Sequence, residues 1–286
     1  MKKKLLNLSG KIDNSFIEVF ETIVDVATLQ SVPFFVIGAT ARDIILTSGY
    51  GIETKRATLD IDCGVQVSDW QQYKKLTEGL ISTGKFESTN KTQRFSYKES
   101  FLIDIIPFGK IAGPDNSISW PPDQGTEMST LSFEESYQHS LTVRLRTNPV
   151  LDIQFTSLAG LALMKIISWN DNYPRRDKDA KDLSIIMFNY LDGGNQERLY
   201  NEERDLVGEN FDYTRASARL LGRDIATIAN PKTTETVLEI LNRETGEQDR
   251  YRLVEDMLRS GSPFNDDFDE KLQLLEELKS GFLDKL

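Results

Sequence analysis

Asp60 and Asp62, separated by one residue, are the side chains of this sequence best suited to do chemistry. They lie in an alternating stretch, Thr58 to Val67, which predicts a β-strand. Side chains two positions apart on a strand face the same way, at a distance of about 7 Å. Two such carboxylates can bracket a pair of Mg²⁺ ions about 4 Å apart, as two-metal phosphoryl chemistry requires. For the pair taken alone, a solvent-facing edge of an amphipathic strand is the alternative.

A third carboxylate usually completes such a site from a neighbouring strand. Asp104 is the best candidate, because it is the one acid within the apolar run FLIDIIPFG. Burying a lone charge is costly, so we expect Asp104 to have either a charged partner or a metal ion. It would also deprotonate or orient the attacking hydroxyl. Asp152, in VLDIQF, is the alternative for this role. Asp104 is favoured because it follows the Asp pair sooner and Asp152 sits in an ordinary alternation.

Upstream of the acids, a glycine turn ends an apolar strand, Phe34 to Ile37, and opens a helical segment. The backbone N–H groups of Gly38 and Ala39 are therefore expected to face an anion such as a triphosphate at the helix N-terminus. A simple strand-to-helix turn explains the same residues. Arg42, one helical turn along, is expected either to contact a phosphate or to pair with Asp43 or Asp60 as part of the scaffold.

The elements that position these residues change in character along the chain. Up to Phe155 the sequence alternates helical segments with short strands and ends in a hairpin turned at Asn148-Pro149. After Thr156 nearly every segment has helical periodicity, including a helix start at Asn230-Pro231. We therefore predict an α+β fold, with a mixed sheet and flanking helices in residues 1–155 and an all-α domain in residues 156–286.

Composition narrows the class of protein. The 286 residues are 39% hydrophobic and 28% charged, which is typical of globular proteins, and no stretch is long and apolar enough to predict a membrane span. One cysteine and one histidine exclude a disulfide framework and a structural Cys/His zinc site, and they favour a cytoplasmic setting. From Leu151 onward there are 18 Lys and Arg against 27 Asp and Glu, a net charge of −9 out of −11. That half is a poor nonspecific binder of nucleic acid.

The glycine turn, the Asp-x-Asp pair and the third Asp together resemble the polymerase-β-like nucleotidyltransferase superfamily. The segment Gly38-Ala39-Thr40-Ala41-Arg42-Asp43 is similar to the first motif of tRNA CCA-adding enzymes but departs from it at the second glycine. A longer match, beginning with Arg56-Ala57-Thr58-Leu59-Asp60-Ile61-Asp62, resembles the AbiEii/AbiGii toxin family. The resemblance covers roughly residues 30–190.

The second part of that match is the segment LAGLALMKIISWNDNYPRRDKDAKDL. By the resemblance, Lys165 is the helix lysine that reaches the triphosphate, and Lys178, Asp179 and Asp182 match a Lys-Asp-x-x-Asp run. A lysine is a natural point-charge partner for phosphate, but Lys165 could instead snorkel or pair with Asp182 within the helical packing. A basic cluster accompanies the motif and is either an entry rim for RNA or triphosphate or a solvated loop: Arg175, Arg176, Lys178 and Lys181.

The resemblance implies an enzyme that uses an NTP and two Mg²⁺ ions to transfer a nucleoside monophosphate to a hydroxyl, releasing pyrophosphate. Asp60, Asp62 and Asp104 would hold the metals, and Gly38, Ala39, Arg42, Lys165, Lys178 and Asp182 would bind the nucleotide. The implied acceptor is an RNA such as the 3′ end of a tRNA, which would make the protein a toxin with a possible antitoxin partner. Alternatives are a transferase acting on aminoglycoside-type small molecules, which the acidic half suits, and an inactive nucleotide-binding module. A CCA-adding enzyme is disfavoured because its Glu-Asp-x-x-Arg motif was not found.

Overall fold

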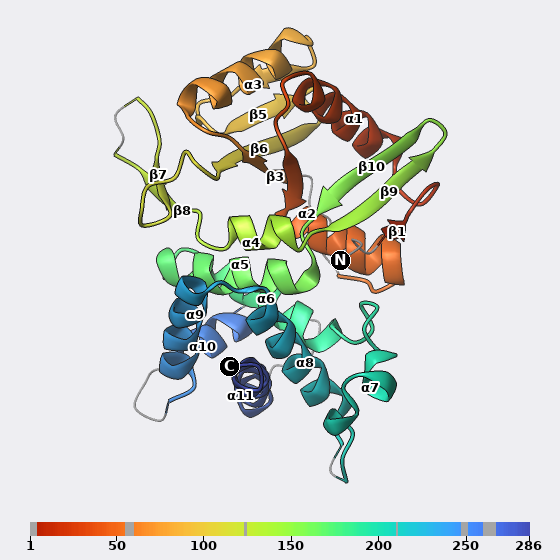
Figure 1. Cartoon of the computed structure of the whole chain (residues 1–286), viewed down its shortest axis with the longest axis vertical. Coiled ribbons are helices and arrows are strands. Elements are labelled where there is room, and N and C mark those ends of the chain that lie inside the picture. Colours follow the sequence, from red (N-terminus) through yellow and green to blue (C-terminus); the bar gives the residue numbers. More distant parts are fainter. Residues whose placement is uncertain (1–4, 55–59, 123–124, 210, 247–250, 260–266) are drawn as a thin grey trace. The chain divides into compact units, whose positions relative to one another are not determined.

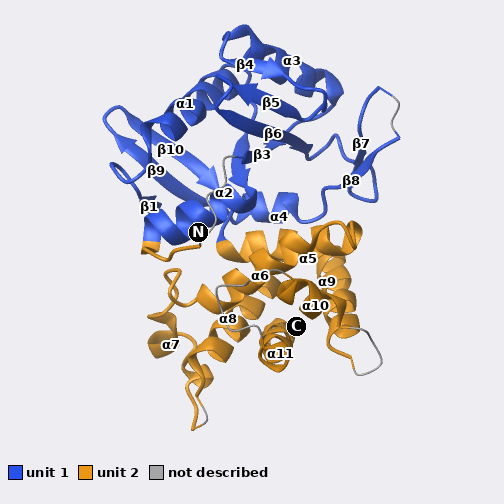
Figure 2. Ribbon diagram, turned by 180° about the vertical axis from the view of Figure 1, so that it is seen from behind, with its two compact units in different colours: residues 1–49, 56–157 blue, residues 50–55, 158–286 orange. Residues whose placement is uncertain are grey.

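The protein is described here from a computed structural model, covering residues 5–54, 60–122, 125–209, 211–246, 251–259 and 267–286. The chain forms two compact units (Figures 1 and 2). Unit 1 comprises residues 1–49 and 56–157, and unit 2 comprises residues 50–55 and 158–286. The fold class is α+β, as predicted, because the mixed sheet lies in unit 1 and unit 2 is helical.

Unit 1 is built on an eight-stranded mixed sheet. Its strands are β1 Leu5–Asn7, β2 Phe34–Ile37, β3 Asp60–Gln66, β4 Phe86–Ser88, β5 Arg94–Tyr97, β6 Phe101–Phe108, β9 Leu141–Thr147 and β10 Val150–Phe155. Their order in the sheet is β1-β9-β10-β2-β3-β6-β5-β4. β3 lies between β2, with which it is antiparallel, and β6, with which it is parallel. The strand that carries Asp60 and Asp62 therefore lies inside the sheet, not at an edge.

The central strands form because their apolar residues can be buried on both faces of the sheet. Phe35 and Val36 in β2 and Ile61 and Cys63 in β3 have no exposed surface. Such strands are near-continuous apolar runs, so a charged residue within them has to lie near a strand end or find a partner. Burial raises the pKa of the Cys63 thiol, and the Asp62 and Asp104 carboxylates raise it further.

Helices cover the sheet of unit 1. α1 (Asn14–Leu29) begins at the N-cap Asp13, and α3 (Trp70–Ser82) begins at the N-cap Asp69; these two helices lie side by side (Figure 1). α4 (Phe133–Gln138) brings Phe133 and Tyr137 against aromatic rings of β2 and β6. α2 (Gly38–Asp43) follows β2 directly and continues as the π-helix η1 (Ile44–Gly49). A small hairpin, β7 (Ser117–Ser119) with β8 (Glu127–Ser129), forms between β6 and α4.

Unit 2 is helical throughout its described part. Its elements are α5 Leu158–Asp171, α6 Asp177–Asn189, α7 Arg198–Asn201, the 3₁₀-helix η2 Arg204–Leu206, α8 Tyr213–Ile228, α9 Pro231–Glu244, α10 Arg252–Leu258 and α11 Phe268–Leu283. α9 begins as predicted, with Asn230 as N-cap and Pro231 in the first turn. No helix in the described ranges has both the length and the apolar composition needed to cross a membrane.

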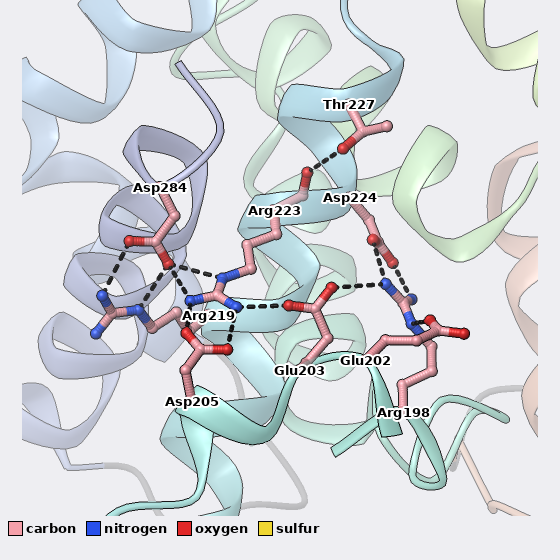
Figure 3. A network of polar contacts seen from close by, with 9 residues as sticks. All are labelled: Arg198, Glu202, Glu203, Asp205, Arg219, Arg223, Asp224, Thr227 and Asp284. Carbon is pink, nitrogen blue, oxygen red and sulfur yellow. Dashed lines mark hydrogen bonds and ion pairs between the residues drawn. The ribbon is translucent and has the colours of Figure 1, made fainter. Parts of the chain in front are cut away.

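Helices α8 and α11 approach each other closely at a pair of glycines. A Cβ added at Gly222 would lie 2.0 Å from the carbonyl oxygen of Leu278, and one added at Gly281 would lie 1.9 Å from that of Arg219. Beside this contact, a charge network joins α8 to the C-terminal end of α11 and to η2 (Figure 3). Arg223 contacts Glu203, Asp205 and Asp284, which holds these segments against α8.

Candidate active site

The strand register brings the predicted third acid beside the Asp pair. β3 and β6 run parallel, and Asp62 is the direct partner of Asp104 across the ladder, while Asp60 pairs with Leu102. Residues directly opposite each other on neighbouring strands point to the same face of a sheet, so Asp60, Asp62 and Asp104 share one face. The burial of Ile61 agrees with this, because its side chain lies on the opposite face and has no exposed surface. Asp60 is half exposed, with 48% of its side chain accessible.

Arg94 is a member of this cluster that the sequence reasoning missed. It lies opposite Asp104 on the antiparallel strand β5. Its Nε and Nη2 atoms donate to the two carboxylate oxygens of Asp104, each at 2.7 Å, and Nη2 lies 3.8 Å from Oδ2 of Asp60. The hydrogen bonds to Asp104 raise the pKa of Arg94 above its ordinary value, and the carboxylates of Asp60 and Asp62 add to the effect. Arg94 is therefore a permanent cation within the acid cluster.

The position of Arg94 was accessible from the sequence. A hairpin turn at Lys98-Glu99-Ser100 makes Tyr97 face Phe101, and counting back from that pair places Arg94 opposite Asp104. In the structure the ladder has this register, and Lys98 and Glu99 adopt positive φ angles of 47° and 57°. The signal was the hairpin register rather than any motif, because an arginine on a strand is unremarkable by itself.

Gly38 adjoins the acids at the end of β2. Its neighbour Ile37 pairs with Asp62 across the β2–β3 ladder. Gly38 has a φ of +71°, and a Cβ added there would lie 2.0 Å from Oδ2 of Asp62. The carboxylate of Asp62 therefore packs against the backbone of the glycine turn, which only glycine permits. The hydroxyl of Thr40 donates to the backbone oxygen of Asp60 at 2.5 Å, which ties the start of α2 to β3.

The sequence left two roles open for Arg42, contact with a phosphate and pairing within the scaffold, and the structure shows the pairing. Its side chain has no exposed surface, and its Nε and Nη2 lie 2.8 and 2.7 Å from Oδ1 of Asp43. In this conformation the guanidinium is covered by protein. Contact between Arg42 and a nucleotide stays a prediction.

Asp152, the alternative third acid, lies away from the cluster. It forms a bidentate pair with Arg144 on the neighbouring strand β9, with both distances 2.8 Å. The contact lowers the pKa of Asp152. β10 meets β2 at Phe155 and Val36, so Asp152, three residues earlier in a parallel strand, aligns with the start of β2. Gly38 and the acid cluster are at its other end.

Two of the predicted nucleotide-binding residues of unit 2, Lys165 and Asp182, belong to an ion-pair cluster. Nζ of Lys165, on α5, lies 2.6 Å from Oδ1 of Asp179 and 2.6 Å from Oδ2 of Asp182, both on α6. Arg176 contacts the other oxygen of Asp179, also at 2.6 Å. Burial lowers the pKa of Lys165, but the two carboxylates more than offset this, so the ammonium is stabilised. These contacts are the pairing alternative that the sequence left open for Lys165.

The basic cluster of the same motif is divided between paired and exposed side chains. Arg176 donates to the hydroxyl of Ser168 as well as to Asp179, and Lys181 pairs with Asp177 at 2.8 Å. Arg175 and Lys178 are exposed. Binding of nucleotide by Lys165, Lys178 and Asp182 stays a prediction. Residues 56–59, which open the match to the AbiEii/AbiGii family, lie outside the described residues.

The donor atoms of the three acids can be compared with those that the expected Mg²⁺ requires. Carboxylate oxygens are the donors that Mg²⁺ prefers, and Asp60 and Asp62 offer them on one face of β3. Within the described residues, however, no group of three or more His, Cys, Asp or Glu side chains is arranged to hold a metal ion. Both oxygens of Asp104 are engaged by Arg94. The chemistry of the donors therefore fits a divalent cation, whereas the arrangement of the three acids as a triad does not.

Comparisons with known proteins give distant matches. No family model and no curated protein matches the sequence. Among solved structures, the chain is similar to the lincosamide antibiotic adenylyltransferase LnuA in its lincomycin-bound form, with 20% identity, coverage of 58% of this chain and 94% of that chain, and a TM-score of 0.35. It is also similar to ANT(2″)-Ia in complex with adenylyl-2″-tobramycin, with 12% identity, coverage of 65% and 93%, and a TM-score of 0.37.

A third similar structure is the Thermotoga maritima CCA-adding enzyme complexed with tRNA, with 10% identity, coverage of 97% of this chain and 83% of that chain, and a TM-score of 0.32. Likenesses at this level carry no argument about what this chain does. The resemblance to the AbiEii/AbiGii family likewise stays a prediction. The functional proposal therefore has to rest on the site residues themselves.

Proposed function

We propose that this protein is a nucleotidyltransferase that moves a nucleoside monophosphate from an NTP to a hydroxyl acceptor. The observation that carries the proposal is the cluster of residues on two strands and a turn: Asp104 and Asp62 are direct ladder partners, Asp60 shares their face, and Gly38 packs on Asp62. Clustered acids beside a glycine turn are suited to phosphoryl transfer, which depends on positioning and on neutralising charge.

In the proposed reaction the acceptor oxygen forms a bond to the α-phosphorus of the NTP. The bond between the α-phosphorus and its bridging oxygen breaks, and pyrophosphate leaves. Asp104 is the residue proposed to orient the acceptor hydroxyl and receive its proton. Its pairing with Arg94 fixes the direction of its carboxylate in this conformation.

The remaining roles follow the sequence expectations, except those of Lys165 and Asp182. Asp60 and Asp62 are proposed to hold a divalent cation, expected to be Mg²⁺, which when bound would neutralise phosphate charge. The backbone amides of Gly38 and Ala39 are proposed to bind phosphate oxygens, with Lys178 as an exposed cation available to the nucleotide. Lys165 and Asp182 are buried and paired, so we give them a supporting role in holding α5 against α6.

The acceptor proposed first is an RNA, with the 3′ end of a tRNA as the specific case implied by the toxin resemblance. The protein would then be a growth-arresting toxin with an antitoxin partner. A second acceptor class is favoured by a specific observation: the residues from Leu151 onward carry a net charge of −9. Such a charge repels RNA and attracts a cationic small molecule such as an aminoglycoside.

The test is transfer of label from each of the four α-labelled NTPs in the presence of Mg²⁺. One arm contains total RNA and the other a panel of aminoglycosides and lincosamides, so that the labelled product distinguishes the two acceptor classes. Asp60→Asn and Asp62→Asn are expected to reduce transfer by at least 100-fold, because each removes a charged ligand. Asp152→Asn is the matched control, since Asp152 is a strand aspartate paired with Arg144 away from the cluster.

Transfer to RNA that survives in Asp152→Asn and is lost in Asp60→Asn would support the first proposal. Transfer to the small molecules alone would replace it with the second. If the wild type labels neither class of acceptor, or labels no better than Asp60→Asn, the chain is not this kind of enzyme, and the inactive nucleotide-binding module becomes the better hypothesis.

A further inference from the structure

Arg94 occupies the place where the third acid of the site would contact a cation. Its guanidinium engages both oxygens of Asp104 at 2.7 Å and lies 3.8 Å from a carboxylate oxygen of Asp60. The side chains of Arg94 and Asp104 are 24% and 16% exposed, so the pair is only partly covered by protein. Three carboxylates and one guanidinium thus share a small, partly buried space.

This pair differs from the other strand-to-strand Arg–Asp pair in unit 1. Arg144 and Asp152 have the same bidentate geometry, with distances of 2.8 Å, and similar exposure of 29% and 32%. Arg94, however, also lies within ion-pair distance of a second acid, Asp60. The guanidinium of Arg94 is therefore placed between acids that belong to one site, rather than bridging two strands only.

A guanidinium and a divalent cation at this position exclude each other electrostatically. Arginine does not lose its proton in proteins, so the positive charge of Arg94 can leave the site only if the side chain moves. While it stays, it neutralises Asp104, takes up both its oxygens and repels any cation placed between Asp60 and Asp62. A charge-assisted bidentate pair of this kind is also among the stronger side-chain contacts.

We propose that Arg94 is a positioning residue that binds the Asp104 carboxylate where a divalent cation would otherwise bind it. A cation that uses Asp104 as a ligand must therefore displace the Arg94 side chain. The inference rests on the proposed function, because it concerns the same three acids. It accounts for three acids that share one face of the sheet through their register and yet are not arranged as a metal triad. Loading of the site with metal would then be coupled to a movement of the Arg94 side chain.

The experiment measures Mn²⁺ binding to the full chain without nucleotide, by titration calorimetry and by the electron paramagnetic resonance signal of free Mn²⁺. Arg94→Ala is expected to bind Mn²⁺ roughly 10- to 100-fold more tightly than the wild type, because the competing charged hydrogen bonds are gone. Arg94→Lys keeps the charge but loses the bidentate geometry, so its affinity should lie between the two. Arg144→Ala is the matched control and should bind as the wild type does, within threefold.

Two results would overturn the inference. One is Mn²⁺ affinity in Arg94→Ala that equals or falls below that of the wild type. The other is an equal gain in Arg144→Ala, which would mean that any lost positive charge attracts the ion. If Arg94→Ala does not fold, as judged by circular dichroism, Arg94→Lys decides the matter, since weaker binding than the wild type contradicts displacement.

The outcome can be separated from that of the proposed function because the binding assay uses no NTP and no acceptor. Tighter Mn²⁺ binding in Arg94→Ala together with no label transfer by the wild type would support displacement and refute transferase activity. Label transfer that depends on Asp60, with unchanged Mn²⁺ affinity in Arg94→Ala, would support the transferase and refute displacement.

Discussion

Replacing Lys165 with methionine tests whether this residue is chiefly a structural cation. Lys165→Met keeps the length of the side chain and removes its charge, so the apolar stem can still pack in α5. The change removes the ammonium 2.6 Å from Asp179 and 2.6 Å from Asp182, whose side chains are 0% and 4% exposed. Two nearly inaccessible carboxylates would thereby lose a shared cation.

The expected loss of stability in Lys165→Met follows from the burial of the two carboxylates. Breaking a buried ion pair by removing one partner costs about 3–5 kcal/mol. Arg176 remains 2.6 Å from Asp179, so the loss falls mainly on Asp182, and we expect the low end, about 3 kcal/mol. This is a large part of the roughly 5–15 kcal/mol that stabilises a typical protein. With an m-value of about 2–3 kcal/mol/M, the urea midpoint should fall by roughly 1–1.5 M.

The assay is urea denaturation followed by circular dichroism at the helical band, where unit 2 contributes strongly. Lys178→Met is the control, because Lys178 belongs to the same motif but is exposed, and it should change the free energy of unfolding by less than about 0.5 kcal/mol. The double variant Lys165→Met/Asp182→Asn should recover part of the loss, since it also removes one of the two buried carboxylate charges that Lys165 faced. A Lys165→Met protein within 1 kcal/mol of the wild type would refute the reasoning and return Lys165 to the nucleotide-binding candidates.

Two further predictions concern the glycine turn and the C-terminal charge network. Gly38→Ala should destabilise unit 1 by about 1–3 kcal/mol in thermal unfolding, because φ is +71° and the new Cβ would overlap the Asp62 carboxylate; an unchanged melting temperature would contradict this. Asp284→Asn should cost about 1 kcal/mol at pH 7, since Arg219 and then Arg223 lower the pKa of Asp284. A lowered folded-state pKa means that this stability is present above the ordinary pKa of an aspartate and is lost as the pH falls through the folded-state pKa. The difference between the two proteins should therefore shrink in urea titrations as the pH is lowered from 7 towards 3, and a constant difference would refute the assignment.

Local sequence patterns were sufficient to predict much of the fold. The alternation of apolar residues predicted β3 and the β9–β10 hairpin, and the pair Asn230-Pro231 predicted the start of α9. These features depend on interactions between residues a few positions apart in the chain, so the local sequence is enough to predict them. The shift from mixed elements to helices after Thr156 was visible for the same reason.

Long-range pairing was harder to predict. Asp60 and Asp104 are 44 positions apart, and only the parallel β3–β6 ladder makes Asp62 and Asp104 direct partners. The partners of Lys165 were foreseen as one possibility, but whether its charge meets carboxylates or an open surface depends on how α5 packs on α6. Arg94 was overlooked because its importance comes from its pairing with Asp104 on the neighbouring strand.

The sequence by itself determined which groups are available: three strand aspartates, a glycine at a turn and a lysine within an apolar helix. It did so because residue type and local spacing set charge, backbone freedom and the facing of side chains. The tertiary structure alone decided which cation each acid meets. Sheet register places Arg94 on Asp104 and Arg144 on Asp152, and helix packing places Lys165 on Asp179 and Asp182. Ion pairing depends on distances of a few ångströms between side chains on different strands or helices, and the pairing of strands and the packing of helices set those distances.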